Sequence, residues 1–144
     1  MNEPFVMLVD DEESFVDAMS KRLDVRNVQV ITALSGDEAL GKLGRNRNVD
    51  VVVLDVKMPG MDGLAVLQEI KKNHPLIEVI MLTGHATVET AVEGMKKGAY
   101  DYLMKPCEID ELLAKVRAAA GRKREQEEKI REAAVKNALK NFPH

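Results

Sequence analysis

Five polar side chains follow short apolar runs of the sequence and could together handle a phosphoryl group. They are Asp10, Asp11, Asp55, Thr83 and Lys105. Carboxylates that lie close together repel one another strongly unless a cation lies between them. Mg²⁺ prefers oxygen ligands and often binds one or two carboxylates together with phosphate oxygens. Together with a hydroxyl and an ammonium group, these carboxylates are typical of a phosphoryl site with a carboxylate nucleophile.

Short runs of aliphatic and β-branched residues predict five β-strands, and strands buried on both faces of a parallel sheet have this composition. The predicted strands are Phe5 to Val9, Val28 to Thr32, Val51 to Leu54, Ile77 to Leu82 and Tyr100 to Met104. Ligands of such sheets bind beyond the carboxyl ends of the strands. Because the five polar side chains follow the first, third, fourth and fifth strands, we expect them to meet at one edge.

Segments with helical periodicity separate the predicted strands. Their apolar stripes are Phe15, Met19 and Leu23; Ala39, Leu40 and Leu43; Val66, Leu67 and Ile70; Val88, Ala91, Val92 and Met95; and Ile109, Leu112, Leu113 and Val116. Ser35 and Glu38 form a capping-box pattern before the second stripe, and Gly98 marks the end of the fourth. The strict alternation predicts a doubly wound α/β domain with a five-stranded parallel sheet and helices on both faces. We expect most methionines to fill its core.

After Ala120 the sequence keeps helix-forming residues but loses a wide apolar face. We therefore divide the chain into a domain over residues 1–120 and a helical C-terminal extension or linker over residues 121–144. Residues that follow one another at alternating steps of four and three positions form a helical seam through this region. The seam is apolar at both ends but charged at Lys123 and Glu127. That pattern is typical of a poor coiled coil or of a solvated extension of the fifth helix. Gly121 weakens the helix by about 1 kcal/mol relative to Ala.

The composition excludes several classes of protein. A chain of 144 residues suits one domain, and 45% hydrophobic with 31% charged residues fits neither a disordered nor a membrane protein. The acidic N-terminus is unlike a secretory signal. A single cysteine excludes an internal disulfide and fits a cytoplasmic location. A net charge of −3 and 3% aromatic residues indicate no direct binding of nucleic acid.

Four motifs carry a resemblance to a known family: LVDDEE (8–13), LDVKMPGMDG (54–63), MLTGHA (81–86) and GAYDYLMKP (98–106). In this order and spacing they resemble the receiver domain of two-component response regulators, over about Phe5 to Ala120. The resemblance implies a flavodoxin-like fold with strand order 2-1-3-4-5 and the function of a phosphorylation-activated signalling switch. The most similar pattern is that of receivers that control transcription through an attached ATPase.

The resemblance also implies roles at the acidic edge. Asp55 would be the phosphoacceptor and would take the phosphoryl group from a phosphohistidine on a sensor histidine kinase. Asp10 and Asp11 would hold Mg²⁺, directly or through water, together with Asp55 and the backbone carbonyl of Lys57. Such a domain would not be an enzyme in the usual sense, because it would assist only its own phosphorylation and dephosphorylation.

A second group of roles concerns the switch itself. Thr83 would move to hydrogen-bond the aspartyl phosphate, Lys105 would pair with a phosphoryl oxygen, and the rotamer of Tyr102 would follow Thr83. The peptide bond before Pro106 would be cis, a geometry that is rare outside X–Pro bonds. The surface of the fourth helix, fifth strand and fifth helix would then repack. A homodimer through this surface and the C-terminal helix is the expected assembly.

Two residues are expected to tune the site. Lys57 lies two residues after Asp55, and His85 lies two residues after Thr83. Both would border the path by which hydrolytic water enters, and our hypothesis is that Lys57 pairs with the phosphoryl group and slows its hydrolysis. The alternative interpretation is that both are solvated loop residues.

Two alternative functions can be weighed against the switch. A phosphatase of the haloacid dehalogenase type also places an Asp nucleophile after a strand, but it needs a second Asp at the position of Lys57. A degenerate receiver that acts only as an interaction module is disfavoured by the complete set of five polar side chains. No helix-turn-helix or Gly-rich ATPase loop follows Ala120, so the sequence does not define the output.

Overall fold

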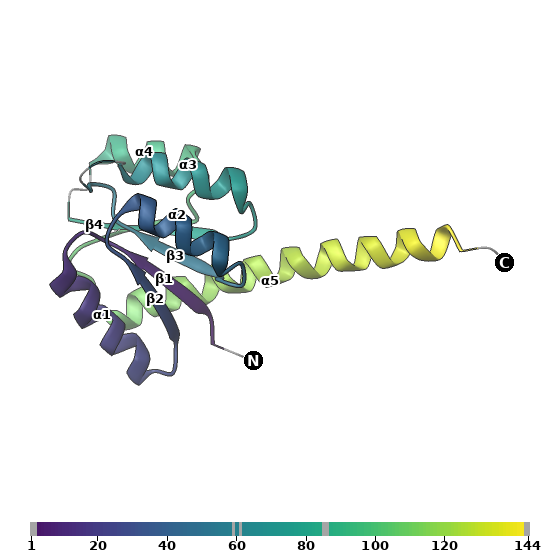
Figure 1. Cartoon of the computed structure of the whole chain (residues 1–144), viewed down its shortest axis with the longest axis horizontal. Helices are drawn as coiled ribbons and strands as arrows, with labels where there is room; N and C mark the ends of the chain where they lie inside the picture. Colours follow the sequence, from purple (N-terminus) through teal and green to yellow (C-terminus); the bar gives the residue numbers. More distant parts are fainter. Residues whose placement is uncertain (1–2, 59, 61, 85–86, 143–144) are drawn as a thin grey trace.

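The computed structural model describes residues 3–58, 60, 62–84 and 87–142. Strands and helices alternate along the chain (Figure 1). The strands are β1 (Phe5–Val9), β2 (Gln29–Ala33), β3 (Val51–Leu54), β4 (Glu78–Thr83) and β5 (Asp101–Met104). The helices are α1 (Glu13–Val25), α2 (Gly36–Arg45), α3 (Gly63–Asn73), α4 (Val88–Lys96) and α5 (Ile109–Lys140).

The strands form one parallel sheet in the order β2-β1-β3-β4-β5, which confirms the predicted fold class. Strands β2 and β4 each start and end one residue later than predicted. The N–H of Val28 donates to the Leu23 carbonyl of α1, and the N–H of Ile77 donates to the His74 carbonyl after α3, so neither pairs with a neighbouring strand. The last strand likewise starts at Asp101 rather than at Tyr100.

Side chains of each central strand alternate between two cores. Met7, Val52 and Val79 face the core that α2 and α3 complete, whereas Leu8, Val53 and Ile80 face the core that α1 and α5 complete. The helices therefore cover both faces of the sheet (Figure 1). This arrangement leaves the carboxyl ends of the strands as the place where polar groups can gather without crossing a core.

Side-chain caps start three of the helices. The side chains of Ser35, Asp62 and Thr87 accept hydrogen bonds from the backbone N–H groups of the third helical residues of α2, α3 and α4. The predicted capping box at α2 is only half formed, because the Glu38 carboxylate accepts from the N–H of Leu34 instead of that of Ser35. The helix nevertheless begins where the sequence places it.

The apolar stripe of α4 lies on the solvent side of that helix. Val88, Val92 and Met95 are 81%, 45% and 47% exposed, and the buried residue of α4 is Gly94. A Cβ at Gly94 would lie 3.6 Å from the Met81 side chain, so the absence of a side chain lets α4 pack closely on the sheet. Most of the methionines that the structure describes are buried, as expected, namely Met7, Met19, Met58 and Met81, whereas Met95 and Met104 are exposed.

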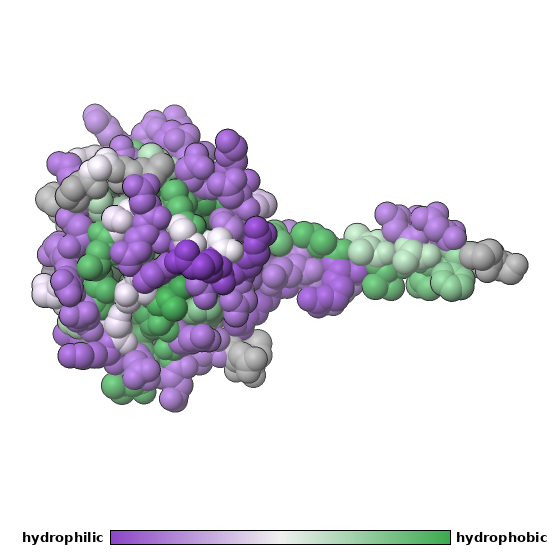
Figure 2. All heavy atoms as spheres, in the orientation of Figure 1, coloured by the Kyte–Doolittle hydropathy of each residue, from purple (hydrophilic) through white to green (hydrophobic). Residues whose placement is uncertain are grey.

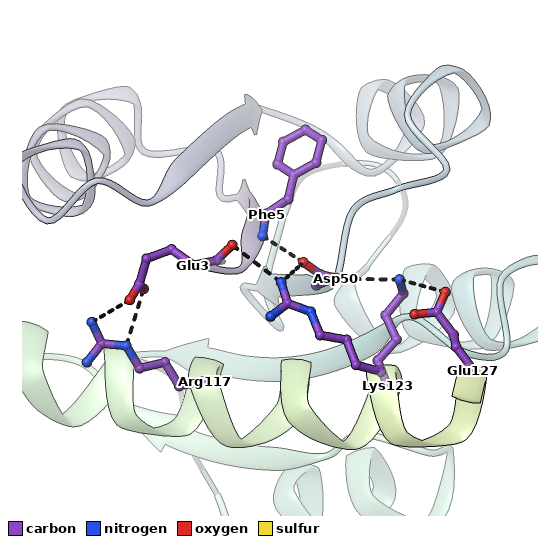
Figure 3. A network of polar contacts seen from close by, with 7 residues as sticks. Glu3, Phe5, Asp50, Arg117, Lys123 and Glu127 are labelled. Atoms are coloured by element: carbon purple, nitrogen blue, oxygen red, sulfur yellow. Dashed lines mark hydrogen bonds and ion pairs between the residues drawn. The ribbon is translucent and has the colours of Figure 1, made fainter. Parts of the chain in front are cut away.

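Helix α5 runs without interruption through Gly121 and projects away from the body of the domain (Figure 1). Not all of the charged residues in the middle of α5 are exposed to solvent, because Lys123 is only 5% exposed. Its ammonium donates to Asp50 at 3.2 Å and to Glu127 at 3.3 Å, and Arg124 donates to the other oxygen of Asp50 at 3.1 Å (Figure 3). The domain body therefore holds α5 beyond the predicted boundary at residue 120.

Beyond Glu127, every described residue of α5 is exposed. The face of this projecting segment seen in Figure 2 carries both hydrophilic and apolar side chains. Ile130, Val135 and Leu139 are its large apolar residues within the helix, with exposures above one half. None of the described helices is long and apolar enough to cross a membrane.

Candidate functional site

Two buried carboxylates mark the centre of the strand ends. Asp10 follows β1 and is 2% exposed, and Asp55 follows β3 and is 3% exposed. Each continues its strand by one backbone hydrogen bond, from Asp10 N–H to the Ala33 carbonyl and from Asp55 N–H to the Val9 carbonyl. Since β1 and β3 are parallel neighbours with Val9 opposite Leu54, the two carboxylates lie side by side.

Asp11 completes an acidic cluster with these two residues. One carboxylate oxygen from each of Asp10, Asp11 and Asp55 can be chosen so that all three lie within 4.8 Å of one another. Asp11 is exposed, so the cluster opens to solvent on one side. Its donor set consists of hard oxygen ligands with an open side for water or phosphate, which suits a divalent cation such as Mg²⁺.

Lys105 reaches this cluster from the loop after β5. Its backbone N–H donates to the Thr83 carbonyl at 2.9 Å, and its peptide bond to Pro106 is cis. The ammonium nitrogen lies 2.5 Å from Asp10 Oδ2, 3.3 Å from Glu12 Oε1 and 3.9 Å from Asp55 Oδ2. One cation thus lies among several carboxylates, and the site keeps a surplus of negative charge.

Both partners of the shortest contact, Asp10 and Lys105, have raised pKa values. Burial raises the pKa of Asp10, and the hydrogen bonds from Lys105 and the Glu12 N–H offset this only in part. For Lys105, burial works against the charged form, but the hydrogen bond and charge of Asp10, with the charges of Asp55 and Glu12, raise its pKa. A further cation at the cluster would lower the pKa of both groups, because it favours the charged carboxylate and disfavours the charged ammonium.

Thr83 and Tyr102 lie on the neighbouring strands β4 and β5. Thr83 is the last residue of β4 and is fully buried, and it stands opposite Met104 in the register of the two strands. Tyr102 is half-buried, and its enclosed hydroxyl has no hydrogen-bond partner among the residues that the structure describes. An enclosed hydroxyl without a partner lowers the stability of the folded state.

The loop after Asp55 approaches the site through its backbone. Lys57 is exposed, and its N–H donates to Asp55 Oδ1 at 3.4 Å. Gly63 begins α3 with its N–H donating to the Val56 carbonyl at 2.7 Å. A Cβ on Gly63 would lie 2.2 Å from the Asp55 carbonyl oxygen, so no other residue fits there without a backbone shift. His85, the second predicted tuning residue, lies outside the described residues.

Two contacts of Lys105 went unrecognised in the sequence. Glu12 is the third of four consecutive acidic residues, and this acidic run was the only signal in the sequence for its ion pair with Lys105. Phe15 places its ring 4.1 Å, measured to the centroid, from the Lys105 ammonium. Its place in the apolar stripe of α1 predicted only a core contact, and no local pattern indicates a partner 90 positions away in the chain.

Fold and site together define a doubly wound α/β domain with an acidic, lysine-containing edge suited to a phosphoryl group. The family model of the response regulator receiver domain matches residues 6–117. The chain belongs to this family, which confirms the resemblance seen in the sequence, and the role of a phosphorylation-controlled signalling switch fits it.

Several relatives support the assignment. The chain is 38% identical over 128 residues to the DNA-binding transcriptional regulator NtrC of Salmonella typhimurium, covering 89% of this chain and 27% of the relative. The solved receiver domain of NtrX from Brucella abortus is 37% identical with a TM-score of 0.75, over 81% of this chain and 98% of that one. A receiver domain from Clostridium thermocellum is 36% identical with a TM-score of 0.80, over 84% and 97%.

The curated relatives are much longer than the matched region. The chain spans about a quarter of the length of the NtrC relatives, at 27%. The similarity therefore concerns the receiver part of those regulators.

Proposed function

We propose that Asp55 accepts a phosphoryl group from a phosphohistidine of a sensor histidine kinase. The observation that carries this proposal is the placement of Asp55, buried at the centre of the strand ends with Lys105 Nζ at 3.9 Å from its Oδ2. An Asp55 oxygen attacks phosphorus, a P–O bond forms, and the P–N bond breaks with its electron pair leaving on the imidazole nitrogen. Lys105 stabilises the negative charge on the phosphoryl oxygens.

Mg²⁺ is the proposed cofactor of this transfer. The carboxylates of Asp10, Asp11 and Asp55 fit such an ion, and the backbone carbonyl of Lys57 is its proposed fourth protein ligand. The bound ion would supply neutralisation of charge on the transferring group. The chain's own contribution is to hold Asp55 in place, through the backbone bond to Val9 and the tight packing of Gly63.

The switch is proposed to run from Thr83 to Tyr102. A new aspartyl phosphate draws the Thr83 hydroxyl toward it, and the Tyr102 ring moves into the space that becomes available. The exposed apolar residues of α4 and β5, Val88, Val92, Met95 and Met104, lie on the surface that would respond. We propose that this surface and the C-terminal helix support a homodimer.

Light scattering with and without beryllofluoride, a mimic of the phosphoryl group, tests the dimer. We expect a larger mass with the mimic. A monomer under both conditions would contradict the dimer while leaving the phosphoacceptor role intact.

We further propose that residues 121–144 connect the receiver to an effector domain or a downstream protein. The relatives that extend beyond the receiver support this proposal. Within this segment, the contacts of Lys123 and Arg124 with Asp50 attach the first residues to the receiver body, and the part beyond Glu127 would be the free part of the linker. We propose that the chain is cytoplasmic and that it does not itself bind nucleic acid.

The decisive experiment is phosphorylation by acetyl phosphate in the presence of Mg²⁺, followed by mass spectrometry of the intact chain. We expect one phosphoryl group on the wild type and none on Asp55→Asn. Asp62→Asn is the matched control, because Asp62 lies in the same loop and Asn is an equally good helix cap. An unmodified wild type would revive the degenerate interaction module, and continuous turnover of a general phosphate ester would favour a phosphatase.

The tuning role of Lys57 is tested by the lifetime of the aspartyl phosphate. Our proposal is that its ammonium pairs with the phosphoryl group and hinders attack by water, which its exposed position beside Asp55 allows. Lys57→Ala should then lose the phosphate faster than the wild type. An unchanged or longer lifetime in the variant removes this role.

A further inference from the structure

The Lys105 ammonium has an aromatic partner that the proposed chemistry does not use. The ring of Phe15, in the first turn of α1, lies with its centroid 4.1 Å from Lys105 Nζ. This is well within the range of about 6 Å in which the negative face of an aromatic ring attracts a cation. Phe15 is half-buried and also packs against the core on the α1 and α5 side of the sheet.

The other partners of this ammonium are all carboxylates. Asp10, at 2.5 Å, and Asp55, at 3.9 Å, are also proposed ligands of a divalent cation. A cation bound there would neutralise their charge and repel the ammonium, so these contacts weaken when the site is loaded. The third carboxylate, Glu12, has a side chain that is 64% exposed, and ion pairs of such groups contribute little.

Phe15 differs from these carboxylates in one respect. A phenyl ring does not bind Mg²⁺, so its attraction for the ammonium does not compete with the metal. The ring also lies against a lysine side chain that is only 14% exposed, where the attraction is less screened by water. Without such a contact, the flexible four-carbon stem of Lys105 has many rotamers, and fixing the ammonium in one place costs conformational entropy.

We propose that Phe15 is a positioning residue that keeps the Lys105 ammonium beside Asp55 when the carboxylates turn to a bound cation. The inference rests on the proposed phosphoacceptor function and adds to it a residue from α1. Lys105 is the group that meets the phosphoryl oxygens, and Phe15 acts only through Lys105. An aliphatic side chain at this position would support the stem of Lys105 but would not attract its charge.

Three variants separate these two contributions. Phe15→Leu keeps an apolar side chain and removes the ring, whereas Phe15→Tyr keeps the ring. We expect Phe15→Leu to be phosphorylated by acetyl phosphate about 3- to 30-fold more slowly than the wild type, and Phe15→Tyr to stay within about 2-fold. In a Lys105→Met background, Phe15→Leu should have no further effect, because the cation is absent.

A readout without metal or phosphodonor tests the contact itself. The ε protons of Lys105 should resonate upfield in the NMR spectrum of the metal-free wild type, because they lie near the face of the Phe15 ring. Phe15→Leu should abolish this shift and Phe15→Tyr should keep it. Urea unfolding of each variant confirms that the fold is retained.

The outcomes distinguish this inference from the proposed function. If the wild type is phosphorylated on Asp55 and Phe15→Leu reacts equally fast, only the positioning role is overturned. An equal loss with and without the Lys105 charge would also overturn it, since Phe15 would then act through packing of α1. A wild type that acetyl phosphate leaves unmodified overturns the proposed function and this inference together, whatever the NMR shift.

Discussion

Lys123 Nζ lies 3.2 Å from Oδ1 of Asp50, in a buried ion pair between residues 73 positions apart in the chain. The two side chains are only 6% and 9% exposed. The second oxygen of Asp50 accepts from the backbone N–H of Phe5 at 2.8 Å and from Arg124 at 3.1 Å (Figure 3). One carboxylate before β3 thereby joins the start of β1 to the middle of α5, at the opposite end of the sheet from the acidic cluster.

Replacing Asp50 with Ala should therefore destabilise the protein strongly. The change leaves the buried Lys123 ammonium without its main counter-charge and the Phe5 N–H without an acceptor, and breaking such a buried pair typically costs about 3–5 kcal/mol. Urea unfolding monitored by circular dichroism measures the loss. Glu127→Gln is the control, because that partner of Lys123 is more exposed and its loss leaves Asp50 in place. A loss below about 1 kcal/mol for Asp50→Ala would argue against a strong pair.

Gly63→Ala should be among the most damaging single-methyl additions in the chain. The new Cβ would meet the Asp55 carbonyl oxygen at 2.2 Å and the Val56 Cα at 2.6 Å, both of which are backbone atoms that cannot move aside. We expect a loss of about 2 kcal/mol or more, with slower phosphorylation because the Asp55 loop shifts. Gly44→Ala is the matched control in α2, since nothing lies within 4 Å of its Cβ. That variant should gain up to about 1 kcal/mol, and equal behaviour of the two variants would contradict the prediction.

The raised pKa of Asp10 predicts a pH dependence of the metal-free protein. In the unfolded chain this carboxyl titrates near 3.8, whereas burial moves the folded pKa upward. Between these two values the folded state holds more protons, so stability falls as the pH rises through that window. Asp10→Asn should remove this fall and be more stable than the wild type at neutral pH, with the difference vanishing below pH 3.8. A wild type that is the more stable at neutral pH would disprove it.

Mg²⁺ should stabilise the folded chain, because it relieves repulsion among Asp10, Asp11 and Asp55. The gain at a free concentration of 100 times the dissociation constant is about 2.7 kcal/mol, and a chelator should reverse it. Asp11→Asn should shift the midpoint of the magnesium titration of unfolding stability to higher concentration. Glu13→Gln, an exposed acidic neighbour outside the cluster, should leave that midpoint unchanged. A parallel shift in both variants would indicate general screening instead of a site.

Much of the candidate site could be predicted because its signals are local. Strands β1 and β3 are short apolar runs, and the change to a polar residue at Asp10 and Asp55 marks where each run leaves the core. The rules for parallel α/β sheets then bring those ends together. The strand order and the roles of individual residues came from the family resemblance, since periodicity alone does not order strands.

Other features have no local signal. Helical periodicity showed a stripe on α4 but not its orientation, and the small Gly94 rather than the stripe faces the sheet. The charged residues Lys123 and Glu127 interrupt an apolar seam, and the buried carboxylate that accommodates Lys123 lies in a distant segment. Contacts of this kind depend on how the tertiary structure places two segments, which the pattern within either segment does not contain.

The continuous helix α5 has a mechanical consequence. Its 32 residues form a rod of about 48 Å, and the part from Lys123 to Lys140 reaches about 26 Å beyond its attachment at Asp50. For a rigid rod of that length, a tilt of about 10° at the attachment moves the far end by roughly 4.5 Å. Displacements of α5 that are too small to disturb the packing beside the sheet thus become, at the far end of the helix, shifts that approach the spacing of about 5.4 Å between neighbouring helical turns.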